Sequence, residues 1–597
     1  MLNSAKKKRA IVYAGIWTLY ACFSLIAAVL INEYVKVSYP HLVQAFLSWL
    51  PDSFDASIAI AVLFACVTGI CFYLFLTKYS SINQVFRRFS IPGLSLHFLR
   101  RDVIIASVVI FLFWLPIIVI MYPSGFTMDT HNQLYMFQAG APTYYTTTGE
   151  TINAEIIDSH PATLTLLYGA FWSLGHAFGS QNFGIFLFVV LQSIVLAVEL
   201  GLTTCYLERQ KVPYGLRFLT LFFFAVFPLF GHYAATMLKD VSYVAVFLPW
   251  FLMWLEIARS RGGVLEDRRF IVAFFLLGGF CILFKKLGVY VLVACLIVLI
   301  GALGKFRARF LALSIATVVC FSLFVPWIVS PLVGGVAPGG KQEMLSPAIQ
   351  QTTTLLIEQP DSFSEAELLD INKVFDTSRA QRDYEVFRAD GAKNTFHSSA
   401  TGQDIIQFLQ IWLQKGIQHP IEYAYSIAGT TAMQYIPYLK FTYYTDEDYG
   451  YRNELFASVS PGYAVDISQP KALIELNNYL EFDSIESKIS NLPLVSLFFT
   501  QGFYGGWIPV FALLVVLYAR RIQTCGSADE RSSQPMLLLG LVPALIVMAF
   551  FFVSPVSSPR YVLPMLYISP LLLAWAWYAL SGTIVQDKTQ DELEQCA

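Results

Sequence analysis

The sequence predicts an all-α polytopic membrane protein with about twelve membrane-spanning helices. First, the 597-residue chain is 56% hydrophobic and only 13% charged, whereas a soluble globular protein carries roughly 25% charged residues. Second, a dozen apolar runs are long enough to cross the ~30 Å hydrocarbon layer of a bilayer. Third, lysine and arginine gather in short segments between these runs, as they do in cytoplasmic loops. The formal net charge of −2 argues against a nucleic-acid partner.

The predicted spans begin near the N-terminus and continue almost to the C-terminus. The first run follows a basic cluster at residues 6–9 and resembles a signal peptide. Its length and the lack of a small-residue cleavage site favour a retained signal-anchor helix instead. In chain order, the runs are residues 11–31, 56–77, 103–122, 182–207, 214–230, 241–258, 270–284, 287–303, 310–330, 503–519, 535–553 and 561–580.

One further apolar stretch, residues 161–179, decides the topology. If it crossed the membrane, every later basic cluster would face outward, against the rule that such loops stay in the cytoplasm. If it does not cross, those clusters fall inside, and the loop 123–160, which has no lysine or arginine, falls outside. The second arrangement satisfies the charge rule at every loop. The later clusters lie at residues 209–217, 259–269, 305–309 and 520–521.

We therefore expect residues 161–179 to form a helix along the outer membrane surface. Its aromatic and polar residues Tyr168, Trp172, Ser173 and His176 suit an interfacial position. The protein is then a multi-pass cell-membrane protein with both termini in the cytoplasm and its large loops outside.

Five parts follow from this topology. A two-span segment with a cytoplasmic loop precedes a transmembrane core, whose outer loop comprises residues 123–181. A mainly helical extracytoplasmic domain comes before the last three spans, and Ser364 with Glu367 forms an expected capping box there. The last spans and a cytoplasmic tail complete the chain. The boundaries are 1–102, 103–330, 331–502, 503–580 and 581–597.

Asp129 is the candidate catalytic residue. It lies a few residues after the third predicted span, at the start of a short helical pattern. A carboxylate there could deprotonate an acceptor hydroxyl as a general base. The structural alternative is a helix cap, since Thr127 and Asp129 both suit that position. The other polar groups expected at the same membrane face favour catalysis.

Two Asp-x-His pairs, Asp129/His131 and Asp158/His160, occur in one outer loop. Such pairs could ligate a divalent metal, but ligand identity without geometry is weak evidence, and we assign no metal site. We expect His160 to position a phosphate, or Asp158 to cap the helix that follows Pro161. His131 and Asp158 are secondary candidates for the site.

Four basic side chains are expected at the outer membrane boundary. Lys239, beside Asp240, lies between the fifth and sixth spans; Lys285-Lys286 lies between the seventh and eighth; Arg560 precedes the last. A lysine at the bilayer centre costs roughly 2.5–3.5 kcal/mol on insertion scales. A solvated turn at Lys239-Asp240 and simple snorkelling of the lysine pair are the alternatives. We predict instead that the four cations surround the phosphate of a lipid-linked substrate, with Asp240 beside them.

In this order, these residues resemble the GT-C superfamily of polytopic membrane glycosyltransferases, and more closely a poorly characterised bacterial branch of it. The resemblance covers most of residues 103–580. Its matching points are an acidic residue in the first large outer loop, His160-Pro161 before a juxtamembrane helix, Lys239-Asp240, the sequence Lys285-Lys286-Leu287-Gly288, a large outer domain before the last spans, and Arg560-Tyr561.

The resemblance implies a GT-C-like fold and transfer of a sugar, with inversion, from a polyprenyl-phosphate donor on the outer face. By position, Asp129 would be the base, and Lys239, Lys285, Lys286 and Arg560 would bind phosphate. The acceptor would be a cell-envelope glycan, lipid or protein. Many members have an acidic pair where this chain has Asp129-Thr130, which argues against a metal-dependent variant. Two spans also precede the segment that corresponds to the usual first helix.

Two other classes of function remain open from the residues alone. Twelve spans with both ends inside is also a common layout for a transporter or flippase of a lipid-linked or anionic solute. The absence of an internal repeat and the gathering of ionisable residues at one face favour the enzyme. The third class is a non-enzymatic envelope-assembly or scaffold protein, which a wide separation of Asp129 from the basic residues would favour.

Overall fold

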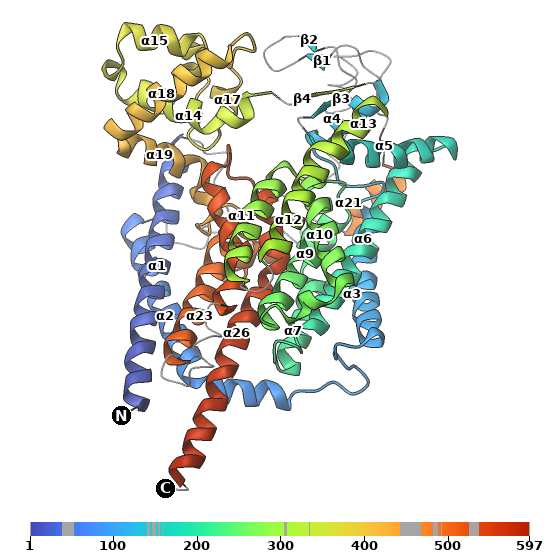
Figure 1. Ribbon diagram of the computed structural model, residues 1–597, viewed down its shortest axis with the longest axis vertical. Coiled ribbons are helices and arrows are strands. Elements are labelled where there is room, and N and C mark those ends of the chain that lie inside the picture. The colour runs from blue at the N-terminus through green and yellow to red at the C-terminus, as the bar shows by residue number, and fades with distance from the viewer. Residues whose placement is uncertain are drawn as a thin grey trace.

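Long helices run side by side in this protein, with shorter helices at one end of the bundle and both termini at the other end (Figure 1). The protein is seen here in a computed structural model. The structure describes residues 2–38, 53–139, 144–145, 151–152, 156–158, 160–303, 307–332, 335–338, 340–441, 467, 469–480, 488–490, 492, 494–523 and 536–595.

Eight helical segments of the described chain are long and apolar enough to cross a membrane. The protein is therefore a polytopic membrane protein, as the sequence predicts. The segments are α1 (Leu2–Ser38), α2 (Phe54–Arg88), α3 (Arg100–Ile120), α6 (Gln181–Tyr206), α9 (Lys239–Arg259), α12 (Arg307–Val319) continued through the π-helical turn η4 (Cys320–Phe324) into α13 (Val325–Leu332), the π-helical turn η8 (Phe503–Trp507) continued into α23 (Ile508–Gln523), and α26 (Pro559–Gln595).

The fifth predicted span is bent. It forms α7 (Tyr214–Val226) and α8 (Pro228–Ala234), whose axes differ by 52°. Pro228 starts the second helix, and Phe227 before it has extended backbone angles. Because proline lacks an N–H and disfavours helical angles in the residue before it, the break falls at this point. The pair counts as a ninth span if it crosses the membrane as one unit.

Three other predicted spans form shorter helices. A helix of 17 residues is about 25 Å long at ~1.5 Å per residue, which is less than the ~30 Å hydrocarbon thickness. Helix length thus accounts for eight or nine spans in the described chain, and twelve remains a prediction. The short helices are α10 (Arg268–Phe284, 17 residues), α11 (Lys286–Ala302, 17 residues) and α25 (Val542–Phe550) followed by η9 (Phe551–Val553).

The stretch predicted to lie on the membrane surface forms α5 (Ala162–Ala177). Figure 1 shows this helix lying across the ends of the long helices rather than among them. The prediction that Tyr168 lies at the membrane interface is wrong. Its ring is fully buried in the protein, and its hydroxyl lies 2.9 Å from that of Ser242. Ser173 and His176 are exposed. The helix therefore has one face toward the bundle and one face away from it.

α9 and α26 lie at the centre of the bundle. Trp254 of α9 and Trp575 of α26 are fully buried. Their indole N–H groups donate to the carbonyls of Leu539 and Leu537, at 2.7 and 2.8 Å. Since a buried indole N–H needs an acceptor, these two bonds tie the chain before α25 to both central helices.

The helices at the upper end in Figure 1 have an apolar core of their own, separate from that of the bundle. The predicted capping box is confirmed: the Ser364 hydroxyl accepts from Glu367 N, and Glu367 Oε2 accepts from Ser364 N at 2.8 Å. These helices are α14 (Gln342–Glu358), α15 (Glu365–Asn372), α16 (Thr377–Arg382), α17 (Asp390–Lys393), α18 (Gly402–Gln418) and α19 (Pro420–Thr431).

Four strands of two or three residues depart from the all-α prediction. β1 (Tyr144–Tyr145) pairs antiparallel with β2 (Thr151–Ile152). β3 (Ile156–Asp158) pairs in parallel with β4 (Val336–Pro338). The second pair joins the loop before α5 to the chain that follows α13, and thereby holds Asp158 at the edge of the helix bundle. Strands this short have no alternating apolar pattern that would reveal them in the sequence.

Candidate functional site

Five helices begin around one group of charged side chains at the end of the bundle where α5 lies. The N-terminus of a helix carries roughly half a positive charge, so cations there are costly unless anions lie among them. The five helices are α4 (Met128–Ala139), α5, α9, α11 and α26. The side chains, called the charged cluster below, are Asp129, Asp158, His160, Lys239, Asp240, Lys285, Lys286 and Arg560.

A short pairing of two loops holds the start of α4 against the start of α9. Gly125 and Thr236 form a parallel β-bridge. Gly125 N donates to the Ala235 carbonyl at 3.0 Å, and Met237 N donates to the Gly125 carbonyl at 3.1 Å. The Thr130 hydroxyl donates to the Met237 carbonyl. Residues more than a hundred positions apart in the chain are thereby fixed beside one another.

Asp129 accepts from two cations through one carboxylate oxygen, Oδ2. Lys239 Nζ lies 2.8 Å from this atom and Arg560 Nη1 lies 2.5 Å from it. Thr127, rather than Asp129, caps α4, because the Thr127 hydroxyl accepts from Thr130 N at 3.3 Å. Burial by itself would raise the pKa of Asp129, but the charges of Lys239 and Arg560 outweigh burial and hold that pKa well below its usual range.

His160 lies next to this pair of cations and is held in its neutral form. Its Nδ1 accepts from Lys239 Nζ at 2.9 Å. Burial, followed by the nearby charge of Lys239, lowers the pKa of His160 to about 3, although the carboxylate of Asp129 acts in the opposite direction. The imidazole is therefore uncharged near neutral pH.

Lys285 and Asp240 form the most buried ion pair of the cluster. Lys285 Nζ lies 2.6 Å from Asp240 Oδ1, and the side chain of Asp240 is fully buried. Lys285 Nζ also lies 5.4 Å and 5.3 Å from the ring centroids of Tyr243 and Tyr561, and Arg560 approaches the Tyr561 ring at 5.4 Å. These cation–π contacts link the Lys285 pair to the ion pair of Asp129.

The turn that carries the two lysines depends on a glycine. Gly288 packs against the end of α10 so closely that a Cβ atom would lie 2.0 Å from the Cys281 carbonyl oxygen. Lys285 has extended backbone angles between α10 and α11. The close approach allows α11 to begin at once, which keeps both lysines at the end of the bundle.

Lys286 and Asp158 form the open side of the cluster. Their charged atoms lie 3.2 Å apart, and the two side chains are 49% and 39% exposed. The other oxygen of Asp158 accepts from Ala162 N at 3.3 Å, so Asp158 caps α5, as one of its two sequence interpretations predicts. Because Lys286 is half exposed, it remains accessible to a ligand.

Counted over the described residues, the charged cluster has an excess of positive charge. It contains four cations and three carboxylates, with His160 neutral. Helix N-termini add to the positive potential. An additional anion of one or more negative charges would therefore be stabilised here.

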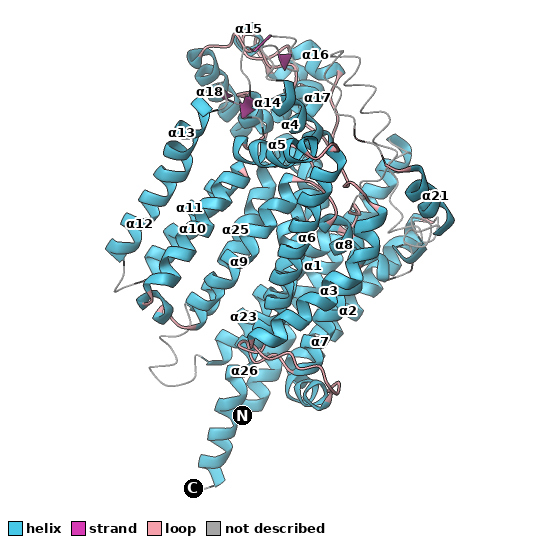
Figure 2. Cartoon of the chain, turned by 90° about the vertical axis from the view of Figure 1, so that its right-hand side faces the viewer, coloured by secondary structure: helices cyan, strands magenta, loops and turns pink. Residues whose placement is uncertain are grey.

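A groove of about 450 Å³ opens beside Lys286 and Asp158. Its walls come from the start of α5, from α10 and α11, and from the turn η4 with α13. Figure 2 shows α10, α11 and α12 together along one side of the bundle. Apart from the ion pair, the walls are mainly apolar and include Leu283, Tyr290 and Phe321. We call this space the side groove; it has one charged end and a long apolar surface.

His131, the remaining sequence candidate, lies in the packed interior. It is fully buried, and its ring centroid lies 5.3 Å from that of Phe126. In the described part of the chain, no group of three or more His, Cys, Asp or Glu side chains is arranged to hold a metal ion.

The family model described as a family of unknown function (DUF6020) matches residues 10–590. The chain belongs to this family. No curated protein and no solved structure matches the chain. The DUF6020 match includes every residue of the charged cluster.

Sequence reasoning missed several residues that shape the site. Tyr243 flanks Lys285, and the hydroxyl of Ser242 lies 2.9 Å from that of Tyr168 and donates to Gln192 Oε1 at 3.2 Å. These residues lie inside apolar runs, where polar side chains at helical spacing resemble ordinary packing positions. The sequence signal that could have indicated them is the presence of the polar residues Ser242 and Gln192 within predicted spans.

Proposed function

We propose that this protein is a membrane glycosyltransferase of GT-C type, which transfers a sugar from a polyprenyl-phosphate donor to a cell-envelope acceptor on the outer face of the membrane. One observation carries the proposal: a carboxylate, Asp129, lies in direct contact with two cations, Lys239 and Arg560, amid helix N-termini at one end of a membrane bundle. Sugar transfer needs cations to bind the donor phosphate and, beside them, a carboxylate to take the proton of the acceptor hydroxyl.

The side groove supports a lipid-linked donor. Its charged end, at Lys286, suits a phosphate, and its apolar wall along α10, α11 and α13 suits a polyprenyl chain. The π-helical turn η4 forms part of this wall, and π-turns within helices are frequent at functional sites. A donor held in this way would have its phosphate at headgroup depth and its sugar beyond the membrane boundary.

The chemical step that we propose is a single displacement. The acceptor oxygen attacks the anomeric carbon, and the bond from that carbon to the phosphate oxygen breaks. The electron pair of this bond goes to the phosphate, and Asp129 takes the proton of the acceptor hydroxyl. Attack opposite the leaving group inverts the anomeric configuration. Lys239, Lys285, Lys286 and Arg560 stabilise the negative charge that develops on the phosphate.

Exchange of ionic partners would couple donor binding to the basicity of Asp129. With its pKa far below the usual range, Asp129 is a weak base while Lys239 and Arg560 contact it. A donor phosphate that takes over these two cations would leave Asp129 with fewer positive neighbours and raise its pKa. Asp129 would then act as a base only when the donor is bound.

A transfer assay tests the proposal. Purified protein in lipid vesicles would receive radiolabelled polyprenyl-phosphate sugars and an envelope extract as acceptor. Asp129→Asn should lower the rate of transfer by roughly 10²-fold or more, because the general base is lost. Asp361→Asn is the matched control, since that carboxylate is exposed and lies far from the cluster in sequence. Transfer at the wild-type rate by the Asp129 variant would exclude the proposed base.

A transporter or flippase is the second candidate, and Glu199 favours it. Glu199 lies within the spanning helix α6 and is buried, and among the described residues its Oε2 has no hydrogen-bond partner. Ionisable residues inside the membrane often belong to transport pathways. Two results together would support transport over sugar transfer. The wild type would translocate a lipid phosphate across the vesicle membrane without transferring sugar, and Glu199→Gln would lose this translocation.

A further inference from the structure

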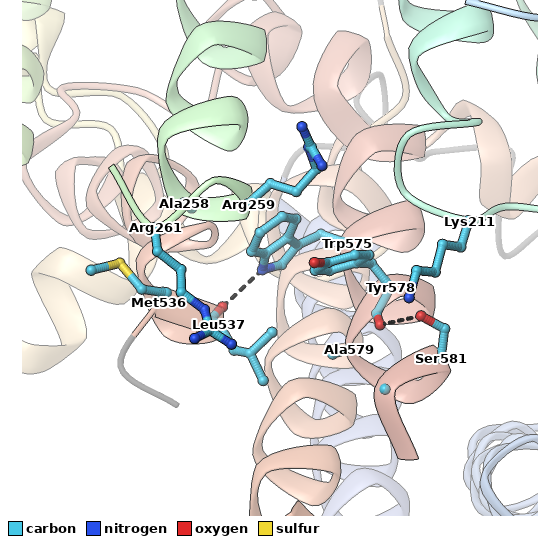
Figure 3. Close-up of a pocket in the computed structure, with 11 residues that line it drawn as sticks. Lys211, Ala258, Arg259, Arg261, Met536, Leu537, Trp575, Tyr578, Ala579 and Ser581 are labelled. Atoms are coloured by element: carbon cyan, nitrogen blue, oxygen red, sulfur yellow. Dashed lines mark hydrogen bonds between the residues drawn. The ribbon is translucent and has the colours of Figure 1, made fainter. Parts of the chain in front are cut away.

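A second cluster of cations lies at the opposite end of the bundle, around a cavity of about 140 Å³ (Figure 3). Its lining includes Lys211, which follows α6, and Arg259 and Arg261, at and after the end of α9. Trp575 and Tyr578 of α26 form an aromatic wall, with ring centroids 5.3 Å apart. The volume is well above the roughly 10–15 Å³ that a single water needs. We call this space the basic cavity.

The backbone at two of these cations is in the left-handed region. Lys211 has φ 59° and Arg261 has φ 53°, and they are two of the three non-glycine residues with positive φ in the described chain. This conformation favours glycine, because a Cβ atom crowds the following carbonyl oxygen. Both strained residues line the same cavity.

Each strained residue closes a helix end of the same type. Lys211 N donates to the Glu208 carbonyl, and Val212 N to the Leu207 carbonyl. After α9, Arg261 N donates to the Ala258 carbonyl, and Gly262 N to the Ile257 carbonyl. These are two Schellman motifs, in which the left-handed position is usually glycine. The negative end of a helix tolerates a cation, but it does not explain why both side chains line one cavity.

The charges around the basic cavity are only partly balanced. Arg259 is committed to Glu256, with contacts of 2.6 and 2.9 Å. Lys211 and Arg261 have no carboxylate partner among the residues that the structure describes, and Lys211 Nζ lies 5.8 Å from the centroid of the Tyr578 ring. Among the residues that the structure describes, the lining of the cavity includes no acidic side chain. Figure 3 shows Arg261 and Lys211 on opposite sides of the two rings.

We propose that the basic cavity, which Lys211 and Arg261 both line, is a binding site for a phosphate group, separate from the charged cluster. A guanidinium suits two phosphate oxygens at once, and a lysine supplies a point charge. Tryptophan and tyrosine beside such a group are typical of the membrane–water boundary. The phosphate can belong to a lipid headgroup or to a soluble phosphate compound, and the two sources share this chemistry.

A binding experiment on the full chain distinguishes the sources. The protein is placed in phosphatidylcholine nanodiscs with or without phosphatidylglycerol, and retained lipid is counted by native mass spectrometry. In a second arm, inorganic phosphate is added to nanodiscs without the anionic lipid, and the shift in melting temperature gives its affinity. Selective retention of phosphatidylglycerol assigns a lipid headgroup, and stabilisation by inorganic phosphate alone assigns a soluble source.

A matched pair of double variants tests the location. Lys211→Gln with Arg261→Gln should lower the affinity for the bound probe by about tenfold or more, because two charge-assisted contacts are lost. Arg268→Gln with Arg269→Gln removes the same charge from exposed positions at the start of α10, outside the cavity lining, and should leave the affinity unchanged. Equal losses in both variants, or no binding of either probe by the wild type, would overturn the proposal.

Two further measurements separate binding from folding. Lys211→Gly should raise the melting temperature, because glycine relieves the left-handed strain, and should weaken binding in the same sample. In the wild type, the bound probe should protect the Lys211 amine from acetylation. Unchanged acetylation at saturating lipid and phosphate would contradict the proposal even if the substituted proteins fail to fold.

Discussion

Asp129 and His160 are neighbours of the same ammonium group, Lys239, and both are shifted toward their unprotonated forms. The cause differs: two cations outweigh burial at the carboxylate, whereas burial and positive charge act together at the imidazole. The result is an anion and a neutral acceptor facing Lys239. This arrangement explains how the ammonium of Lys239 and the guanidinium of Arg560 can lie close together at helix N-termini.

The pKa of His160 predicts a dependence of stability on pH. In the unfolded chain a histidine has a pKa near 6.5, whereas in the folded protein it is about 3. Between these values the unfolded state binds a proton that the folded state does not. The free energy of unfolding should therefore decrease as the pH falls from about 6.5 toward 3.

Melting temperatures of the detergent-solubilised protein between about pH 7 and pH 4.5 test this prediction. His160→Gln keeps an acceptor for Lys239 but cannot titrate, so its melting temperature should fall less over the same range. His176→Gln, at an exposed position, is the control and should follow the wild type. Identical curves for His160→Gln and wild type would show that His160 is not held neutral by folding.

Elements rather than residues determine how the cluster is assembled. The break between α10 and α11 places Lys285 against Asp240 in the first turn of α9. The β-bridge between Gly125 and Thr236 places the start of α4 against the start of α9. α26 brings Arg560 to Asp129, which is 431 positions away in the sequence. The charged side chains thus act as contacts between helix ends as well as candidates for substrate binding.

The Lys285–Asp240 contact should be important for the packing of these helices. Lys285→Ala leaves the Asp240 carboxylate buried without its cation, and should lower the free energy of unfolding by about 3–5 kcal/mol. Replacement of both residues by apolar ones, Lys285→Met with Asp240→Leu, should cost less than the sum of the costs of Lys285→Met alone and Asp240→Leu alone. Urea unfolding in detergent supplies a double-mutant cycle, and simple additivity of the two costs would contradict the prediction.

The buried Glu256 links the C-terminal ends of α6 and α9, at the end of the bundle opposite the charged cluster. It contacts Arg209 at 2.7 Å and Arg259 at 2.6 Å, and its Oε2 accepts from the Tyr206 hydroxyl. Glu256→Gln should reduce the free energy of unfolding by roughly 1.5–3 kcal/mol, since hydrogen bonds to charged groups have this magnitude. Glu365→Gln, an exposed change in α15, should have a much smaller effect when both variants are unfolded by heat.

The two ends of the helix bundle carry different features. Both termini lie at one end, with the basic cavity, and the helices from α14 to α19 lie at the other (Figure 1). The rule for basic loops predicts that the first end faces the cytoplasm. The charged cluster and the side groove would then face outward.

Cysteine labelling tests this orientation. In a chain without native cysteines, Ala366→Cys, at an exposed position of α15, should react with a membrane-impermeant maleimide in intact cells. Gly263→Cys, at an exposed position after α9, should react only after permeabilisation. Labelling of both positions from the same side would contradict the predicted topology.

Local sequence features account for many of the elements. Proline at 228 marks the bend between α7 and α8, the lysine pair marks the boundary of α10 and α11, and the Ser364 capping box marks the start of α15. The inward position of Tyr168 and the four short strands could not be predicted in this way. A tyrosine fits an interface or a core equally well, and strands of two or three residues form only where tertiary contacts hold them.

Apolar length and lysine or arginine content are local properties. The residues alone therefore identify a polytopic membrane protein and the charged side chains at the ends of its helices. The three-dimensional packing was needed to show that Asp129 contacts both Lys239 and Arg560, that Lys285 contacts Asp240, and that Lys211 and Arg261 line one cavity. These contacts depend on which helix ends pack together. Sequence spacing does not record that arrangement, since a charge at a helix end can face any neighbour that the packing provides.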